Sequence, residues 1–503
     1  MKYQNPIIPG FYPDPSVCRV GEDFYLVNSS FEYFPGVPIF HSRDLVHWRQ
    51  IGHCLTRRSQ LPLDNAYASG GIFAPTIRFH DGMFYMTTTN MTHGGNFYVT
   101  AHDPAGPWSN PIYVAQGGID PSLFFDRDGR VYFASTSDEG LQQSSIDIQT
   151  GKLRSEARVI WKGTGAQYPE GPHLYHLRGR YYLLIAEGGT EYGHMVCIAR
   201  GDDPFGPFEG CPRNPILSHR SYFSPIQVTG HADLVQSVDG SFWMVFLAVR
   251  PNGHPPTHHL GRETFLAPVQ WSEDGWPMVG RDGRVALEMD AGSLPVEPGE
   301  QPVASFGKDD FESPELGLQY NFLRNPRDED WSLSERPGRL RLSCSEVSLA
   351  DIASPAFIGR RQQHFDCRFK VALDFDPSGE QEEAGITVRM NERHHYDVVV
   401  TLRRGRRSVI VRRTIGTLTA EEACAPLASG PVILCISASR DWYELSAGMA
   451  GEQPTALARG ETRYLSTEVA RGFTGVYFGM YATGNGRRSE RSAYFDWCEY
   501  VEG

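Results

Sequence analysis

Gly179-Arg180-Tyr181-Tyr182-Leu183 is one copy of a short motif that recurs through the first half of this chain. The motif has a Gly or Asp, a variable residue, and then an aromatic pair or Val-Tyr that opens an apolar run. Such a pattern is typical of a tight turn that leads into a half-buried strand. The other copies are Asp23-Phe24-Tyr25-Leu26-Val27, Gly82-Met83-Phe84-Tyr85-Met86, Gly129-Arg130-Val131-Tyr132-Phe133 and Gly240-Ser241-Phe242-Trp243-Met244.

The five copies follow one another at intervals of about 50 residues, which is typical of repeats built from short strands. A second repeat supports the first, since Asp103-Pro104-Ala105-Gly106-Pro107-Trp108 matches Asp203-Pro204-Phe205-Gly206-Pro207-Phe208. Repeated units of this length predict a β-propeller, and five copies predict five blades. Chance spacing of aromatic turns is the alternative, and the agreement between the two repeats argues against it.

The second part of the chain has a different pattern. Residues 293–305 contain three prolines and read as a linker. Residues 306–503 alternate apolar and polar side chains in several stretches, which predicts a sandwich of two antiparallel sheets, jelly-roll or concanavalin-like. The sequence therefore predicts an all-β protein with a propeller over residues 1–292, a linker over 293–305 and a β-sandwich over 306–503.

Composition restricts the partners and the compartment. The 503 residues carry a formal net charge of −13, which argues against nucleic acid as a partner and is compatible with a neutral substrate. The nine cysteines form no CxxC pair, so a reducing compartment fits best. No stretch resembles a signal peptide or a membrane span, and the sequence predicts a cytoplasmic protein without a membrane partner.

The repeat also predicts a site. The residues eleven or twelve positions before the second aromatic of each copy occupy equivalent places in successive blades. Equivalent positions of a propeller surround one axis, so we expect these side chains to gather at one end of the central channel. They are Asp14, Ala74, Asp120, Glu170 and His231.

Three carboxylates that face one pocket repel each other, so one of them is expected to hold a raised pKa. Glycoside hydrolysis needs such a pair, because one carboxyl donates a proton and another acts as base or nucleophile. Two alternatives remain open. Asp14 lies between Pro13 and Pro15 and is also compatible with a plain surface turn, and three acids with one histidine could bind a metal.

Other residues fit a sugar site. Arg262 could bind sugar hydroxyls and keep a neighbouring carboxylate ionised, although a surface salt bridge is the alternative. Phe31 and Phe73 could stack on a sugar face, and each could equally fill the core.

These motifs closely resemble those of the family 43 glycoside hydrolases, in their two-domain β-xylosidase and α-L-arabinofuranosidase branch. The resemblance extends over nearly the whole chain. The stretches that carry it are Asn5-Pro6, Pro13-Asp14-Pro15-Ser16, Gly71-Ile72-Phe73-Ala74-Pro75, Asp120-Pro121-Ser122-Leu123-Phe124, Glu170-Gly171-Pro172-His173-Leu174-Tyr175, Gly230-His231-Ala232, Leu260-Gly261-Arg262-Glu263-Thr264 and Arg471-Gly472-Phe473-Thr474-Gly475.

The resemblance implies an inverting, single-displacement mechanism on a five-bladed propeller. Asp14 would be the general base and Glu170 the general acid, and Asp120 would orient the acid and keep its pKa high. Arg262 would bind the hydroxyls of a terminal pentose and His231 would lie near the axis. The sandwich would offer Phe473 to the pocket mouth.

The implied activity is exo-acting release of terminal β-D-xylose, α-L-arabinofuranose or both from short oligosaccharides. The rivals are a sugar-binding propeller without catalysis and an endo-acting arabinanase. The sequence departs from many relatives, which have Trp at the position of Phe73, and residues 134–138 lack a Trp that some β-xylosidases place beside the leaving sugar. Both departures leave the choice of sugar open.

No cofactor is required by the implied mechanism. Resemblance also suggests a structural calcium near Asp310 and Asp496. The oligomeric state is open, although relatives form dimers or tetramers.

Overall fold

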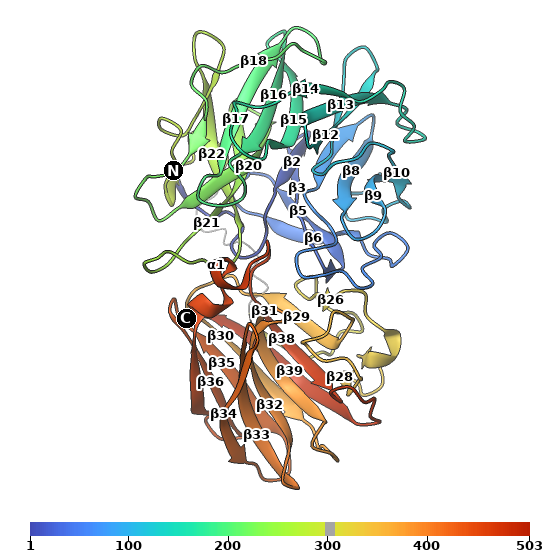
Figure 1. Cartoon of the computed structure of the whole chain (residues 1–503), viewed down its shortest axis with the longest axis vertical. Helices are drawn as coiled ribbons and strands as arrows, with labels where there is room; N and C mark the ends of the chain where they lie inside the picture. The colour runs from blue at the N-terminus through green and yellow to red at the C-terminus, as the bar shows by residue number, and fades with distance from the viewer. Residues whose placement is uncertain (297–306) are drawn as a thin grey trace.

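The computed structural model describes residues 1–296 and 307–503 of the chain. These residues form two β domains, with the propeller drawn at the top of Figure 1 and the sandwich below it. Helical structure in the described residues is confined to short segments, which are η1 (Asp328–Asp330), η2 (Thr462–Leu465) and α1 (Thr467–Ala470). The all-β prediction is confirmed.

The first domain contains five antiparallel sheets of four or five strands. Blade 1 is β2 (Ser16–Val20), β3 (Asp23–Val27), β5 (Gly36–Ser42) and β6 (Arg49–Leu55). Blade 2 is β7 (Thr76–His80), β8 (Met83–Asn90), β9 (Gly95–Ala101) and β10 (Ile112–Tyr113). Blade 3 is β11 (Ser122–Phe125), β12 (Val131–Ser137), β13 (Gly140–Ile146) and β14 (Arg158–Trp161). Blade 4 is β15 (Glu170–Leu177), β16 (Arg180–Glu187), β17 (Met195–Gly201), β18 (Glu209–Gly210) and β19 (Leu217–Ser218). Blade 5 is β20 (Gln227–Gln236), β21 (Phe242–Val249), β22 (Glu263–Trp271) and β23 (Pro277–Val279).

The repeated motif lies at the turn between the first two strands of each blade. Its glycines Gly82, Gly129, Gly179 and Gly240 have φ between 76° and 86°, a left-handed backbone that glycine adopts without a steric penalty. The aromatic residues that follow begin the second strand and pack between neighbouring sheets, as Tyr182 of β16 does in the buried cluster that also contains Leu234 of β20.

The N-terminus closes the ring of blades. Strand β1 (Lys2–Gln4) pairs with β24 (Glu288–Asp290), which follows the last blade. The side chain of Asn5 donates to the carbonyl of Leu266 in β22 at 3.0 Å and accepts from the amide of the same residue at 2.9 Å. The chain therefore holds its first residues against blade 5, next to blade 1.

A buried ion pair connects the inner strands of the propeller. The carboxylate of Asp233, on β20, accepts hydrogen bonds from Ser16 of β2 at 2.6 Å and from Arg78 of β7 at 2.8 Å. The hydroxyl of Tyr175 on β15 donates to the same carboxylate. Strands of four blades therefore converge on Asp233. The Arg78 guanidinium, with His173 and the Ser16 hydroxyl, outweighs the effect of burial and lowers the pKa of this acid.

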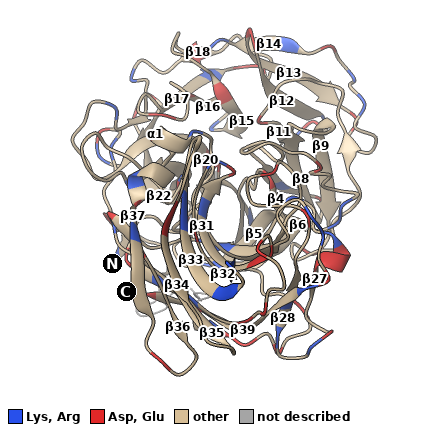
Figure 2. Ribbon diagram, turned by 60° about the horizontal axis from the view of Figure 1, so that its bottom comes forward, with Lys and Arg blue, Asp and Glu red and all other residues tan. Residues whose placement is uncertain are grey.

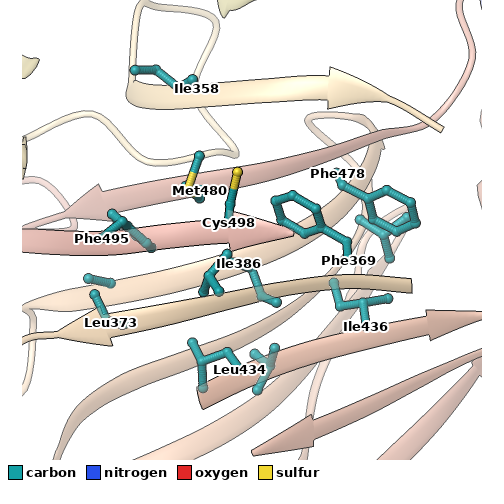
Figure 3. Close-up of a cluster of buried hydrophobic side chains, with 14 of the residues drawn as sticks. Ile358, Phe369, Leu373, Ile386, Leu434, Ile436, Phe478, Met480, Phe495 and Cys498 are labelled. Atoms are coloured by element: carbon teal, nitrogen blue, oxygen red, sulfur yellow. The ribbon is translucent and has the colours of Figure 1, made fainter. Parts of the chain in front are cut away.

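The second domain is a sandwich of two antiparallel sheets. One sheet consists of β25 (Gly307–Asp309), β27 (Trp331–Ser332), β28 (Leu340–Ser343), β30 (Cys367–Asp374), β35 (Val432–Ala438), β36 (Trp442–Met449), β37 (Thr455–Glu461) and β39 (Ser492–Glu502). The other consists of β29 (Ala356–Arg361), β31 (Glu383–Asn391), β32 (His394–Arg403), β33 (Arg406–Ile415), β34 (Leu418–Pro426) and β38 (Tyr477–Thr483). Figure 3 shows apolar side chains from both sheets, among them Phe369 and Phe478, meeting in the core.

The two domains share a buried interface. Strand β4 (Tyr33–Phe34) of the propeller pairs with β26 (Phe322–Leu323) of the sandwich. The rings of Tyr33 and Tyr477 stack with centroids 3.9 Å apart, and Phe11 and Phe31 join the same cluster. The sandwich therefore lies directly against the loops that carry the predicted site.

The predicted domain limits are not tested by this arrangement. Strand β24 ends at Asp290 and β25 begins at Gly307, and most of the predicted linker, from residue 297, lies outside the described residues. The boundaries therefore stay predictions. Figure 2 shows acidic and basic residues interspersed over the ribbon of both domains, and none of the described helices is long and apolar enough to cross a membrane.

Candidate active site

All eight residues predicted to act on or bind the substrate line a single pocket of about 80 Å³ on the propeller axis. Ala74, the fifth position of the repeat, lines it too, so the expected convergence of equivalent positions is observed. Ile119 and Thr190 complete the lining and were not predicted. The lining residues are Asp14, Phe31, Phe73, Ala74, Ile119, Asp120, Glu170, Thr190, His231, Arg262 and Phe473.

Asp14 lies at the entrance of β2 and is buried. Its Oδ1 accepts a hydrogen bond from Arg262 Nη1 at 2.7 Å, and Arg262 Nη2 lies 3.3 Å from Oδ2. The hydroxyl of Ser29 donates to the same carboxylate. Burial disfavours the charged form, but the positive charge of Arg262 and the hydrogen bond from Ser29 help to hold the pKa of Asp14 below its usual value. Asp14 is therefore ionised at neutral pH.

Glu170 is the first residue of β15, and its pKa is shifted in the opposite direction to that of Asp14. Burial and the negative charge of Asp14 raise its pKa to about 7. Asp120, just before β11, is also buried, and burial together with the charges of Glu170 and Asp14 raises its pKa well above the usual value. The pocket thus holds one ionised carboxylate and carboxyls that retain a proton near neutrality.

Arg262 connects Asp14 to the outer wall of the pocket. It precedes β22, and its Nη1 donates to Thr190 Oγ1 at 3.1 Å as well as to Asp14. Its Nε and Nη2 each lie 3.4 Å from the carbonyl oxygen of Phe473. Thr190 lies on the turn between β16 and β17, and the Gly188-Gly189 pair before it was the only signal in the sequence.

Three phenylalanines form the aromatic wall. Phe31 and Phe473 stack with ring centroids 6.0 Å apart, and Phe73 meets Phe473 edge-on at 6.1 Å. Phe31 is buried, whereas Phe473 is 40% exposed at the mouth. The amide of Phe473 donates to Ser69 Oγ at 2.8 Å, which ties this sandwich residue to the propeller.

His231 lies at the bottom of the pocket on the bulged strand β20. Its Nδ1 is 4.0 Å from Asp14 Oδ1, and burial lowers its pKa, so the ring is neutral. A Cβ at Gly171 would lie 3.0 Å from the ring, which explains a glycine directly after Glu170. A second buried histidine, His194, lies 3.7 Å from Glu170 and was missed by the sequence analysis.

The suggested calcium residues lie in the sandwich. Asp496 is 3.4 Å from Arg339, and Asp310 accepts the amide of Glu312. Among the residues that the structure describes, no group of three or more His, Cys, Asp or Glu side chains is placed to hold a metal. Because a calcium site needs several oxygen ligands, Asp310 and Asp496 do not fit one as they stand, and the calcium stays a prediction without geometric support.

The pocket combines an ionised carboxylate, a protonated one and an aromatic wall, which are the groups that glycoside hydrolysis needs. Comparison with known families makes this specific. The model of glycosyl hydrolases family 43 matches residues 3–277, and that of the beta xylosidase C-terminal concanavalin A-like domain matches residues 308–501. The chain belongs to glycoside hydrolase family 43 and is a glycosidase.

Individual proteins similar to this chain are also glycosidases by name. A non-reducing end alpha-L-arabinofuranosidase of Bacteroides ovatus is 46% identical, over 99% of this chain and 94% of that protein. A xylosidase/arabinosidase of Butyrivibrio fibrisolvens is 40% identical, over 99% and 98%. The solved structure of a xylan beta-1,4-xylosidase from Bacillus halodurans superposes with a TM-score of 0.93 at 37% identity, over 99% of this chain and all of that one.

Proposed function

We propose that this glycosidase is exo-acting and inverting, and that it releases a terminal pentose, α-L-arabinofuranose or β-D-xylose, from short oligosaccharides. The observation that carries the proposal is the small pocket on the propeller axis, about 80 Å³, with the sandwich residue Phe473 at its mouth. A small pocket at the end of the propeller channel favours a terminal sugar over an internal stretch of a polysaccharide. The relatives described above are named arabinofuranosidases and xylosidases, which supports a pentose.

In the proposed reaction Asp14 is the general base. Its ionised carboxylate takes a proton from water, and the water oxygen bonds to the anomeric carbon. Glu170 gives its proton to the glycosidic oxygen as the bond between that oxygen and the anomeric carbon breaks. One displacement then inverts the anomeric centre. Solvent afterwards removes the proton from Asp14 and returns one to Glu170.

The remaining pocket residues bind and orient the sugar. Arg262, held by Asp14 and Thr190, presents its guanidinium to sugar hydroxyls. Phe31, Phe73 and Phe473 cover apolar faces of the ring. Asp120, protonated beside Glu170, orients the acid.

The test is the release of nitrophenol from the p-nitrophenyl α-L-arabinofuranoside and β-D-xyloside. The wild type is expected to hydrolyse at least one of them, and Asp14→Ala and Glu170→Ala are controls that remove the base and the acid. A wild type no faster than both controls on either pentoside would contradict the proposal. The ratio of kcat/KM for the two substrates decides the sugar.

Product size tests the exo action separately. Digestion of a labelled oligosaccharide should release monosaccharide from the first time point. Early release of oligomers would instead support the endo-acting arabinanase.

Compartment and partners are further parts of the proposal. All nine cysteines are free thiols, which supports a reducing, cytoplasmic environment. The proposed partner is a small neutral oligosaccharide, and size-exclusion chromatography with light scattering would decide whether the protein forms the homo-oligomers suggested by resemblance.

A further inference from the structure

His194 is a buried histidine beside the catalytic pocket. One of its ring nitrogens has no hydrogen-bond partner among the described residues. His194 ends the turn that carries Thr190, directly before β17. Its side chain has no exposed surface, and its Nε2 lies 3.7 Å from Oε1 of Glu170. This Nε2 makes no hydrogen bond within the described residues. A buried polar atom without a partner is uncommon and calls for a physical reason.

The other ring nitrogen fixes the tautomer. His194 Nδ1 lies 3.2 Å from the carbonyl oxygen of Val228, and a carbonyl can only accept a hydrogen bond. The proton therefore resides on Nδ1. Burial lowers the pKa of His194 to about 3, so the ring is neutral at any pH at which the enzyme would work. His194 consequently presents a lone pair, and not a proton, to Glu170.

The orientation of the ring is imposed by its surroundings. A Cβ at Gly230 would lie 2.2 to 2.4 Å from the His194 ring atoms Cε1, Nδ1 and Nε2. The ring thus fills the space that any other residue at position 230 would need. Gly230 precedes His231, so the same strand fixes both histidines of the pocket.

A second histidine shows what is unusual about His194. His219 is also fully buried, and its Nδ1 is 2.9 Å from the carbonyl oxygen of Ile226. Its Nε2 accepts the amide of Val285 at 3.0 Å. Both rings therefore have the same tautomer, but the lone pair of His219 is used by the backbone, whereas that of His194 faces a carboxyl group.

We propose that neutral His194 is a positioning residue that keeps the proton of the general acid on Glu170 in the free enzyme. At 3.7 Å the lone pair of Nε2 makes no hydrogen bond to Glu170, but it repels a carboxylate more than a neutral carboxyl, so it favours the acid form that the first step of the reaction needs. The inference rests on the proposed role of Glu170 as the acid. The other charged and titratable groups that face this pair are Asp14, Asp120, His231 and Arg262.

His194 takes no proton itself in this scheme. Glu170 passes its proton to the leaving oxygen, and the resulting carboxylate then lies beside an electron pair. Because that arrangement is unfavourable, solvent returns a proton to Glu170 and the acid is restored for the next turnover.

The test compares leaving groups at several pH values. His194→Asn keeps a donor near Val228 but removes the lone pair at the ε position. On a phenyl pentoside, whose poor leaving group needs the acid, kcat/KM should fall about fivefold at pH 7 and about tenfold at pH 8 and above, because the basic limb of the pH profile moves about one unit lower from about 7. The loss should disappear at a pH below the basic limbs of both the wild type and the variant. On the dinitrophenyl pentoside, which leaves without a proton, the change should stay within about threefold.

Three further variants make the result specific. His194→Gln restores a polar acceptor at the ε position and should recover part of the shift. Gly230→Ala displaces the ring and should move the basic limb in the same direction as His194→Asn. His219→Asn, the matched buried histidine, should leave the basic limb in place.

A loss that is equal for both leaving groups and equal at every pH would mean that His194 only supports the fold, and the inference would be wrong. An unchanged basic limb in His194→Asn would overturn it as well. A wild type that hydrolyses none of these pentosides would contradict the proposed function instead, so the two failures are distinguishable.

Discussion

Four residues that line the pocket have a left-handed backbone although none is glycine. The φ angles are 52° at Asp14, 48° at Phe31, 54° at Asp120 and 46° at His231. Such conformations are uncommon for residues with a Cβ and cluster at functional sites. Asp14 and Asp120 lie just before the inner strands β2 and β11, His231 lies within β20, and Phe31 lies between β3 and β4. All four side chains line the pocket.

The electrostatics of single residues predict the pH dependence of the enzyme. Glu170 must be protonated and has a pKa of about 7, whereas Asp14 must be ionised and has a pKa below its ordinary value of 3.8. The profile of kcat/KM should therefore fall above about pH 7 and persist to below pH 4. Glu170→Gln should lose the basic limb on an activated substrate. A profile without a basic limb in the wild type would contradict the assignment of the acid.

Arg262 is expected to determine the pH of the acid limb of the kcat/KM profile, because it lowers the pKa of Asp14. In Arg262→Ala the buried Asp14 loses its counter-ion, so its pKa rises and the acid limb moves to higher pH. We also expect kcat/KM to fall about ten- to a hundredfold, since a hydrogen bond from the charged guanidinium to a sugar hydroxyl contributes about 1.5 to 3 kcal/mol. Thr190→Val is the matched control, because it removes the 3.1 Å contact with Arg262 but leaves the ion pair intact. Equal acid limbs in Arg262→Ala and the wild type would refute this role.

At the level of strands, the inner strands of the blades are held together by Asp233. Ser16, which donates to this carboxylate, lies two residues after Asp14, and His231 lies two residues before Asp233. The ion pair therefore connects the framework of the propeller to its catalytic end.

Asp233→Asn should destabilise the fold at neutral pH by about 3 kcal/mol or more, because Arg78 remains buried without its anion. The pKa of Asp233 is lowered in the folded state, so the stability it contributes is present above the unfolded pKa of 3.8 and is lost as the pH falls below it. Urea unfolding at pH 7 and at about pH 2.5 should show a smaller difference between Asp233→Asn and the wild type at the lower pH. Asp64→Asn, at an exposed pair with Arg58, should cost less than about 1 kcal/mol.

The strand repeat explains how much of this site could be predicted. A turn glycine and an aromatic residue mark the second strand of each blade, and a fixed offset from that mark locates Asp14, Asp120, Glu170 and His231. Thr190 and His194 lie on the turn after the second strand of one blade only, so no repeat reports them. The surroundings of the His194 ring depend on a strand and a turn of blade 4 and on a strand of blade 5, which spacing along the chain does not encode.

At the scale of the whole molecule, the sandwich completes the pocket through Phe473. Deleting the sandwich would be a poor test, because it would also expose Phe11, Phe31 and Tyr33 of the propeller. Phe473→Ala is sharper. Its ring is 40% exposed, so stability should change by less than about 1 kcal/mol, while loss of ring contacts should raise KM about three- to tenfold. Trp442→Ala, 45% exposed on the sandwich, should leave KM unchanged. An unchanged KM in Phe473→Ala would show that the sandwich does not contribute to substrate binding through this residue.

A buried carboxyl at the domain interface predicts how the stability of the whole molecule depends on pH. Glu32 of the propeller accepts the amide of Ser69 at 2.9 Å through Oε2. Its Oε1 makes no hydrogen bond within the described residues. Burial and the charge of Glu392, from the sandwich, raise the pKa of Glu32 to about 7 from an ordinary value of 4.5. Glu392 itself is held ionised by Arg389 and Arg324, which outweigh its burial.

Because the folded state binds this proton more tightly than the unfolded state, stability from Glu32 is fully present below pH 4.5 and declines as the pH rises to about 7. The decline amounts to about 3 kcal/mol. Glu32→Gln cannot ionise, so it should gain stability relative to the wild type between pH 5 and pH 8, measured by urea unfolding. Glu392→Gln should instead be destabilised throughout that range, since it leaves Arg324 and Arg389 buried without their anion. If the difference between Glu32→Gln and the wild type did not change with pH, Glu32 would be ionised in the folded protein and the interface would hold two buried negative charges.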